Sequence, residues 1–268
     1  MLLLSETQPS LTGGMRVPAY SSSDQRRLYG DLAWVWPIIS PPELYIKETE
    51  QFCTVIQEHS QIEVKTLLDL GCGGGHNDYT LKRRFEVTGI DMSAAMLELA
   101  RQLNPEVTYF LDDMRTVRLG KTFDAVTIFD SINYMLTVED LRAAFVTAFM
   151  HLKPGGAFLT LAEETLERFQ QNRIQSSIHA QGDIEITFIE NSYDPDPTDT
   201  IYETTLVYLI RREGRLEIEN DRHLCGIFGL EIWLGLLREV GFEVKQMDFR
   251  PSGVEGEGYP MLVCIKPR

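Results

Sequence analysis

One stretch, residues 65–91, constrains the fold more than any other part of the chain. It reads KTLLDLGCGGGHNDYTLKRRFEVTGID, with an apolar run at 66–70, a glycine turn at 71–75 and a second short strand that ends at Asp91. Glycines at a strand-to-helix turn let a ligand approach bare backbone, and a helix N-terminus offers unpaired N–H groups. The stretch therefore predicts a strand, a glycine turn, a helix and a second strand, with a ligand site at the turn.

Two acids of this stretch indicate the kind of ligand. Asp91 lies about 20 residues beyond the turn, where an acid is well placed to bind the two hydroxyls of a ribose. Asp69 precedes the glycines in the pattern D-L-G-C-G-G-G. A carboxylate there repels a pyrophosphate but suits a cationic amino-acid group. The pair favours S-adenosylmethionine (SAM) over NAD.

Composition excludes several other kinds of partner. The net charge of −15 argues against nucleic acid, because a phosphate backbone attracts a basic surface. No apolar run reaches the roughly 18 residues of a membrane span, and residues 1–4 are too short for a signal peptide. The cysteines form no C-x-x-C pair, so neither a metal site nor a disulfide framework is implied. We expect a cytoplasmic protein that binds neither membrane nor metal.

The rest of the chain continues as alternating strands and helices and then changes character. Further strands are predicted at 107–111, 123–130 and 157–162, and helices at 93–104 and 137–151. From 163 to 229 the pattern becomes antiparallel, with strands at 184–190, 201–211 and 216–224. A helix at 230–240 and strands at 242–249 and 261–266 close the chain. A flexible hairpin loop is expected at 251–258.

These elements predict an α/β fold. We expect a Rossmann-like, mostly parallel sheet of seven strands with helices on both faces, plus an inserted antiparallel sheet of about three strands. The predicted divisions are an arm and cap helices (1–60, with 1–23 loose), a ligand-binding core (61–162), the inserted sheet (163–229) and the closing helix and strands (230–268). The inserted sheet is expected to cover the active site or to form a homodimer contact.

The D-x-G-x-G-x-G arrangement resembles motif I of the class I SAM-dependent methyltransferases. This resemblance implies that Asp69, Gly71 and Gly73 contact the methionine part of SAM and that Asp91 binds the ribose. The L-K-P-G-G turn at 152–156 and the F-D-A-V start of the strand at 123 are also typical of this family.

Residues 112–114, D-D-M, resemble the element of this family that receives the adenine amino group. In that pattern Asp113 is the contact, in preference to Asp112, with Met114 beside the ring. Other residues assigned to the cofactor site are Cys72, Met92, Phe129 and Ser131.

Aromatic residues before the core are candidates for the same pocket. Y-G-D-L-A at 29–33 resembles a segment that folds over the cofactor in many small-molecule methyltransferases. Tyr29 and Tyr45 are therefore candidates for the cofactor or acceptor pocket, and Trp34 and Trp36 for the acceptor wall. The alternative is that these rings pack a helix onto the core.

Within the family, the chain resembles the amino-sugar N,N-dimethyltransferases. The resemblance rests on residues 112–126, on D-S-I-N-Y-M at 130–135, on H-L-K-P-G-G and on R-P-S-G at 250–253. It implies methyl transfer to a small-molecule acceptor at an amine nitrogen. P-I-I-S at 37–40 replaces an expected glycine-rich loop, and an expected histidine near Phe228 is absent. Both departures fall on the acceptor side.

Proton transfer has several candidate residues. A neutral amine attacks a sulfonium methyl without activation, whereas a hydroxyl or thiol needs a base. Asp130, Tyr134 and His223 are the candidate catalytic residues, with Glu163 as a further possibility. For His223 the alternative is a partly exposed strand histidine. The other histidines considered, expected at the surface or on helices, are His76, His151 and His179.

Two other functions remain open at this stage. One is an NAD-dependent oxidoreductase, against which Asp69 in the glycine turn argues. The other is a non-catalytic protein that binds SAM as a sensor or scaffold. Neither requires a metal.

Overall fold

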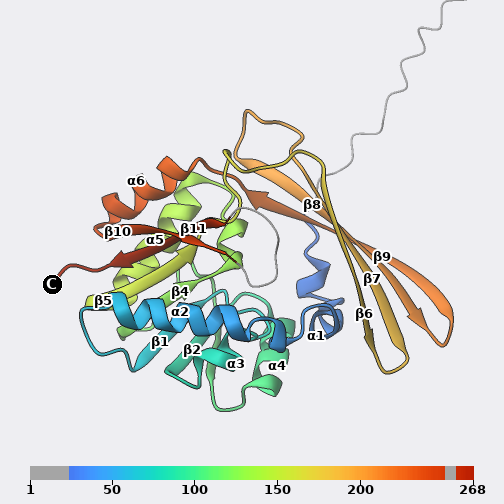
Figure 1. Ribbon diagram of the computed structural model, residues 1–268, viewed down its shortest axis with the longest axis horizontal. Coiled ribbons are helices and arrows are strands. Elements are labelled where there is room, and N and C mark those ends of the chain that lie inside the picture. Colours follow the sequence, from blue (N-terminus) through green and yellow to red (C-terminus); the bar gives the residue numbers. More distant parts are fainter. Residues whose placement is uncertain (1–23, 251–257) are drawn as a thin grey trace, which may run out of the picture.

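A sheet of seven strands forms the centre of the molecule (Figure 1). The computed structural model describes residues 24–250 and 258–268. The strand order is β10-β11-β5-β4-β1-β2-β3, and neighbours run parallel except that β11 is antiparallel to both β5 and β10. The bounds are β1 (Thr66–Leu70), β2 (Glu86–Asp91), β3 (Thr108–Leu111), β4 (Phe123–Ile128), β5 (Leu152–Leu161), β10 (Glu243–Phe249) and β11 (Tyr259–Ile265). The predicted seven-stranded, mostly parallel sheet is confirmed.

Helices cover both faces of this sheet, because alternate residues of its strands enter two apolar clusters. In β1, Leu67 belongs to one cluster and Leu68 to the other. The cluster of Leu67 includes side chains of α2 (Ile46–His59), α3 (Asp78–Leu81) and α4 (Ala94–Leu103). The cluster of Leu68 includes α5 (Val138–His151) and α6 (Leu230–Val240). The core is therefore a three-layer sandwich.

Local sequence signals start and end these helices. The Ser93 hydroxyl accepts a hydrogen bond from the Met96 N–H at 3.0 Å and caps α4. Thr137 caps α5 in the same way, through the Asp140 N–H. Gly241, with a φ of 115°, ends α6 in a left-handed conformation that favours glycine. The predicted helices at 93–104, 137–151 and 230–240 are thus confirmed within a residue or two.

The inserted sheet has four strands in sequential antiparallel order, one more than predicted. They are β6 (Arg173–Gln181), β7 (Ile184–Tyr193), β8 (Ile201–Arg212) and β9 (Arg215–Gly226). β6 is the strand that the prediction missed. Its sequence, RIQSSIHAQ, is mostly polar because it lies at the sheet edge and is largely exposed.

The segment before α2 lies between the inserted sheet and the core (Figure 1). It consists of η1 (Arg27–Tyr29), η2 (Ala33–Val35), α1 (Trp36–Ile39) and η3 (Pro42–Leu44). Its apolar side chains, among them Leu28 and Val35, pack against Leu206 and Tyr208 of the inserted sheet. This packing fixes Tyr29 and the neighbouring aromatic residues beside the core.

Some predictions fall outside the described residues. The loose arm at 1–23 and the hairpin loop at 251–257 belong to this group. In the part that the structure describes, no helix is both long enough and apolar enough to cross a membrane. The cysteines, none of which is disulfide-bonded, are Cys53, Cys72, Cys225 and Cys264.

Candidate active site

The glycine turn after β1 brings bare backbone to the carboxyl ends of the strands. Gly71 has a φ of 77°, and a Cβ added there would lie 2.1 Å from the Ser131 Oγ. Gly73 has a φ of 53°, but its added Cβ would meet only the Met96 side chain, at 3.7 Å. Gly71 is therefore required for packing of the turn, whereas Gly73 leaves its backbone open to a ligand.

Asp91, at the end of β2, ties this turn to the start of α4. One carboxylate oxygen accepts a hydrogen bond from the Gly73 N–H and the other from the Ser93 N–H, each at 2.8 Å. Burial raises the pKa of Asp91, and the two N–H bonds act against this rise. The carboxylate is thus held in place while it also lines a cavity.

The cavity has a volume of about 430 Å³ and lies at the carboxyl ends of the core strands, under the N-terminal segment. That is where ligands bind in open α/β sheets. Most of the predicted residues come together on its wall. These are Tyr29, Tyr45, Gly71, Cys72, Gly73, Asp91, Met92, Met114, Phe129, Asp130, Ser131 and Tyr134.

Asp69 does not reach the cavity wall. It is 1% exposed, and its Oδ1 accepts a hydrogen bond from the Thr127 hydroxyl at 2.8 Å. Burial and the charge of Asp78 raise the pKa of Asp69 well above its ordinary value. A carboxyl group buried beneath the turn and bonded to Thr127 is not open to the cavity, so the geometry does not support the predicted direct contact with the methionine part.

The acid that faces the cavity after β3 is Asp112, not Asp113. Arg115 donates to Asp113 through Nε, Nη2 and its backbone N–H, at distances between 2.6 and 3.1 Å. The guanidinium lowers the pKa of Asp113 against the opposing effect of burial. The preference for Asp113 is therefore corrected: its carboxylate shapes the turn, and Asp112 is available to the ligand.

Aromatic rings form the opposite wall. Trp36 stacks on His76 with ring centres 5.6 Å apart, and both line the cavity. His76 is only 5% exposed, so the expectation of a surface histidine was wrong. Trp34 is not on the wall, and its ring instead lies 4.3 Å from the Arg212 guanidinium.

His151 and His179 have roles outside the cavity wall. His151 ends α5 as expected for a helix residue, but it is buried, with its Nε2 accepting from the Leu119 N–H at 3.0 Å. His179 lies on β6 and contacts the Ser177 hydroxyl at 2.7 Å. Neither belongs to the site.

A pair of carboxyl groups lies where β4 ends. Asp130 opens onto the cavity, and its carboxyl group is hydrogen-bonded to that of Glu163. Burial raises the pKa of both groups, and their mutual repulsion raises that of Glu163 further. The raised pKa makes Glu163 a poor candidate for a free base.

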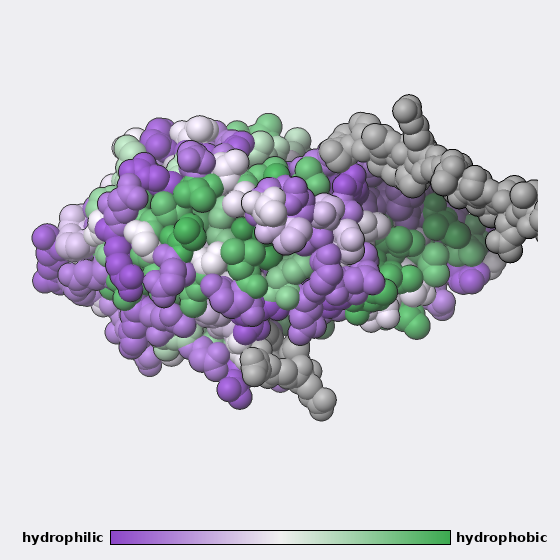
Figure 2. Space-filling model, turned by 90° about the horizontal axis from the view of Figure 1, so that it is seen from above, coloured by the Kyte–Doolittle hydropathy of each residue, from purple (hydrophilic) through white to green (hydrophobic). Residues whose placement is uncertain are grey.

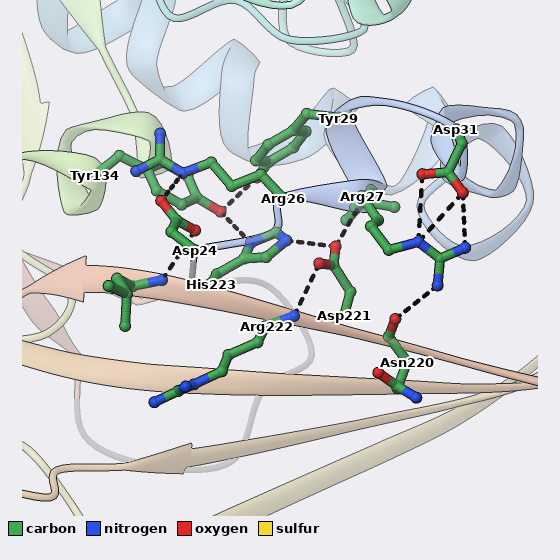
Figure 3. A network of polar contacts seen from close by, with 12 residues as sticks. Asp24, Arg26, Arg27, Tyr29, Asp31, Tyr134, Asn220, Asp221, Arg222 and His223 are labelled. Carbon is green, nitrogen blue, oxygen red and sulfur yellow. Dashed lines mark hydrogen bonds and ion pairs between the residues drawn. The ribbon is translucent and has the colours of Figure 1, made fainter. Parts of the chain in front are cut away.

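His223 lies behind the cavity wall rather than on it. It is 2% exposed, so the alternative of a partly exposed strand histidine is excluded. Its Nδ1 lies 2.7 Å from the Tyr134 hydroxyl and its Nε2 lies 2.7 Å from the Asp221 carboxylate (Figure 3). Sequence reasoning missed Asp221. The signal was the D-R-H spacing in a strand, which points residues 221 and 223 to the same face.

Other wall residues were also missed by sequence reasoning. Apart from His76 and Asp112, they are Arg26, Gly74, Asn77, Ser93, Met96, Arg115, Met135, Leu136 and Asp140. Most of them carry no motif, and they reach the cavity only through the packing of separate elements.

The sheet order, the glycine turn and the cavity define a protein of the Rossmann-like methyltransferase type. The methyltransferase domain family matches residues 67–156. A dTDP-3-amino-3,4,6-trideoxy-alpha-D-glucopyranose N,N-dimethyltransferase of Streptomyces venezuelae is 36% identical over 211 residues, which cover 78% of this chain and 88% of that protein. The chain belongs to the SAM-dependent methyltransferases.

Two solved structures are similar in fold. SAM-bound CalS10, an amino pentose methyltransferase from Micromonospora echinaspora, is 26% identical, with a TM-score of 0.74 over 83% of this chain and 91% of that one. DesVI of Streptomyces venezuelae is 23% identical, with a TM-score of 0.77 over 88% of this chain and 96% of that one. The predictions of the family, the fold and SAM as the cofactor are confirmed, and the NAD-dependent alternative is set aside.

The residues of the cavity fit SAM. Gly73 presents backbone without a side chain, and Asp91 presents a fixed carboxylate beside it. Met92, which is 60% exposed, and Met114 offer apolar surface next to Asp112. Bare backbone, an acid for the ribose and an apolar slot with an acceptor at its edge are what an adenosyl amino acid needs.

Proposed function

We propose that the protein methylates the amine nitrogen of a nucleotide-linked amino sugar. The observation that carries the proposal is the polar end of the cavity. The hydroxyl groups of Tyr29 and Tyr134 lie 2.8 Å apart, and both tyrosines line the cavity together with Asp130. Oxygen lone pairs and a carboxyl group suit an amine or ammonium acceptor. The relative of Streptomyces venezuelae, named for a dTDP-linked amino sugar, supports this substrate class.

Each part of the cavity has a role in this proposal. SAM supplies a sulfonium methyl group that needs no further activation. Asp91, Gly73 and Asp112 hold the cofactor at the glycine turn. Tyr29 and Tyr134 orient the acceptor nitrogen, and the cap segment over them excludes water. Catalysis then comes mainly from alignment of the reacting groups.

The test uses the sugar nucleotide for which the Streptomyces venezuelae relative is named. Purified protein is incubated with SAM and dTDP-3-amino-3,4,6-trideoxy-alpha-D-glucopyranose, and with the analogue that carries a hydroxyl in place of the amine. Mass spectrometry should show one or two added methyl groups on the amine and none on the hydroxyl analogue. Methylation of the hydroxyl analogue alone would refute the amine assignment. Binding of SAM without transfer to either compound, or to other dTDP-amino sugars, would support the non-catalytic alternative.

The inserted sheet supports a second part of the proposal, a homodimer. Its inner face packs on the cap segment, but its outer face carries exposed isoleucines, with Ile178 72% and Ile218 63% exposed. These two lie at opposite ends of one row of paired residues that passes through Thr187 and Leu209. Figure 2 shows hydrophobic residues at the surface of this end of the molecule. A second copy of the same face would cover them.

The proposal also assigns a role to the inserted sheet as a domain. The inserted sheet would act as a fixed back wall rather than as a moving lid, because its inner face packs on the cap segment and His223 of β9 contacts Tyr134 of the core. A cytoplasmic location, expected from the free cysteines, stays a prediction.

A further inference from the structure

We infer that Tyr29, Tyr134, His223 and Asp221 form a proton conduit that removes a proton from the acceptor's ammonium group. The inference rests on the proposed amine acceptor. It assigns to the inserted sheet a chemical role, because two of the four residues belong to β9 (Figure 3).

The four side chains are connected without a gap. The Tyr29 hydroxyl lies 2.8 Å from that of Tyr134, which lies 2.7 Å from the His223 Nδ1. The His223 Nε2 lies 2.7 Å from the Asp221 Oδ2. Tyr29 and Tyr134 line the cavity, whereas His223 and Asp221 are 2% and 1% exposed. The chain therefore leads from the acceptor end of the cavity into the interior.

The ionised state of Asp221 fixes one end of this chain. Its Oδ2 also accepts from the Leu28 N–H at 2.7 Å, and its Oδ1 accepts from the Arg222 N–H at 2.8 Å. The hydrogen bond with His223 and the bond from the Leu28 N–H lower the pKa of Asp221 against the effect of burial. A carboxylate only accepts hydrogen bonds, so the Nε2 of His223 must carry a proton.

The proton on the His223 Nε2 determines which group donates in each of the other hydrogen bonds. The conduit takes His223 in its neutral form, in which the Nδ1 is an acceptor and Tyr134 donates to it. Because the Tyr134 hydroxyl has a single proton, Tyr29 must donate to Tyr134. The free lone pairs of the Tyr29 oxygen are thus left for a donor in the cavity. An ammonium group is such a donor.

A proton that enters at Tyr29 moves through the chain by exchange. The N–H bond of the ammonium breaks and its proton bonds to the Tyr29 oxygen, while the amine keeps the electron pair. The original Tyr29 proton passes to Tyr134, and the Tyr134 proton passes to the His223 Nδ1. His223 becomes an imidazolium beside the Asp221 carboxylate. When the product leaves, the reverse sequence returns the proton to water.

The two hydroxyl groups pass the proton without becoming tyrosinates. Burial raises the pKa of both Tyr29 and Tyr134 above the ordinary tyrosine value. Each therefore keeps a proton throughout. The net acceptor is His223, and the anion that balances its charge is Asp221.

The chemistry of the amine creates the need for this conduit. A lysine-type ammonium has an ordinary pKa of about 10.4 and an α-ammonium about 8, so an amine acceptor arrives largely protonated near neutral pH. Only the neutral amine has a lone pair for attack on the methyl group. A second methyl transfer to the same nitrogen would require loss of a second proton.

Other charged groups lie near the four residues of the conduit. The Arg26 guanidinium lies 4.6 Å from the centre of the Tyr134 ring and is paired with Asp24 at 2.5 Å. Glu190 of β7 would interact with the imidazolium form of His223. Asp221 is the one acidic group among these that hydrogen-bonds the imidazole within the described residues.

The experiment measures kcat with the dTDP-amino sugar at about pH 7 and about pH 10, below and near the amine pKa. The variants are Tyr134→Phe, His223→Asn and Asp221→Asn. At about pH 7 we expect losses of roughly 100-fold in the first two and roughly 10-fold in Asp221→Asn. Near pH 10 these losses should shrink to a few-fold, because the acceptor arrives neutral.

Tyr208→Phe is the matched control. Tyr208 is a fully buried tyrosine of the neighbouring strand β8, and its hydroxyl has no hydrogen-bond partner among the described residues. Its kcat should follow the wild type at both pH values. Losses in the three test variants that are equal at both pH values would indicate a structural role and would overturn the conduit, as would the absence of any loss.

A second measurement separates the conduit from the proposed function. Nitrogen-15 NMR of the five histidines, assigned with His223→Asn, reports the tautomer of His223 without substrate. The conduit requires a protonated Nε2 and an unprotonated Nδ1, and the Nδ1–H tautomer would overturn it. If the wild type methylates no amine, the proposed function fails while this measurement still decides the direction of the chain.

Discussion

At the scale of single residues, Asp112 and Asp113 are neighbours with different surroundings. Asp112 faces the cavity, whereas Arg115 holds Asp113. Asp112→Ala should weaken SAM binding about 10-fold, which corresponds to loss of one hydrogen bond of about 1.4 kcal/mol. Asp113→Ala should leave the affinity within a few-fold but lower the free energy of unfolding by about 1 kcal/mol or less, because the ion pair is partly solvated. Calorimetric titration and urea unfolding measure both quantities, and the opposite ranking of affinities would restore Asp113 as the adenine contact.

A second residue-scale prediction concerns pH. Burial raises the pKa of Asp78 from 3.8 to about 6, so the folded state keeps a proton that the unfolded state releases. The contribution of Asp78 to stability is therefore complete below about pH 4 and is lost as the pH rises through about 6. It amounts to something on the order of 2–3 kcal/mol.

Asp78→Asn should flatten this dependence. Urea unfolding of the wild type and the variant between about pH 4 and pH 7 measures the slope of the unfolding free energy. Asp183→Asn, in the exposed hairpin between β6 and β7, is the control and should keep the wild-type slope. A variant at position 78 that also kept the full slope would contradict the assigned titration.

The sequence was a good guide to site residues whose role depends on the backbone. It was a poorer guide to those whose role depends on the direction of the side chain. Gly71, Gly73 and Asp91 reach the cavity because strand ends and turn spacing place them there. Asp113 does not, because Arg115 captures its carboxylate. The role of His223 follows from its contact with Tyr134, which lies 89 positions away in the chain. No spacing rule reveals such a contact.

At the scale of elements, the glycine turn is the part on which the site most depends. Gly71 and Gly120 both have a positive φ, 77° and 68°. A Cβ at Gly71 would lie 2.1 Å from the Ser131 Oγ, whereas one at Gly120 would meet no described atom within 4 Å. Gly120→Ala should therefore lose about 1 kcal/mol of stability through backbone strain alone. Gly71→Ala should lose more, by roughly a further 1–3 kcal/mol, because the clash with Ser131 adds to that strain. Only Gly71→Ala should also lose SAM binding.

Thermal unfolding and calorimetry distinguish these effects. If Gly71→Ala bound SAM as tightly as Gly120→Ala, the turn would not form part of the ligand site. A larger stability loss in Gly71→Ala than in Gly120→Ala, together with loss of SAM binding only in Gly71→Ala, would support the role of Gly71 in the turn.

Elements with strong hydrophobic patterns were predicted within a few residues, and β6 was not. The central strands β1 and β4 are buried on both faces and read as apolar runs, such as FDAVTI in β4. β6 lies at an edge, and of its two isoleucines both Ile174 and Ile178 are exposed. Its pairing with β7, rather than its own composition, makes it a strand.

At the scale of the whole molecule, the inserted sheet has one partnered and one open face. Ile178→Glu should place a charge in the proposed dimer interface and convert dimers to monomers. Analytical ultracentrifugation across a concentration series measures this change. Met150→Glu is the matched control, because Met150 is 51% exposed on α5, away from this sheet. A wild type that is monomeric at all concentrations would refute the homodimer.

The central claim is that the cavity at the glycine turn binds SAM through the carboxylate of Asp91. Calorimetric titration of SAM into the wild type and Asp91→Ala tests it most directly. We predict saturable binding to the wild type and an affinity at least about 10-fold lower in the variant, because the ribose loses hydrogen bonds to a charged acceptor. Equal affinity in the two proteins, or a wild type that binds NAD and not SAM, would contradict the account.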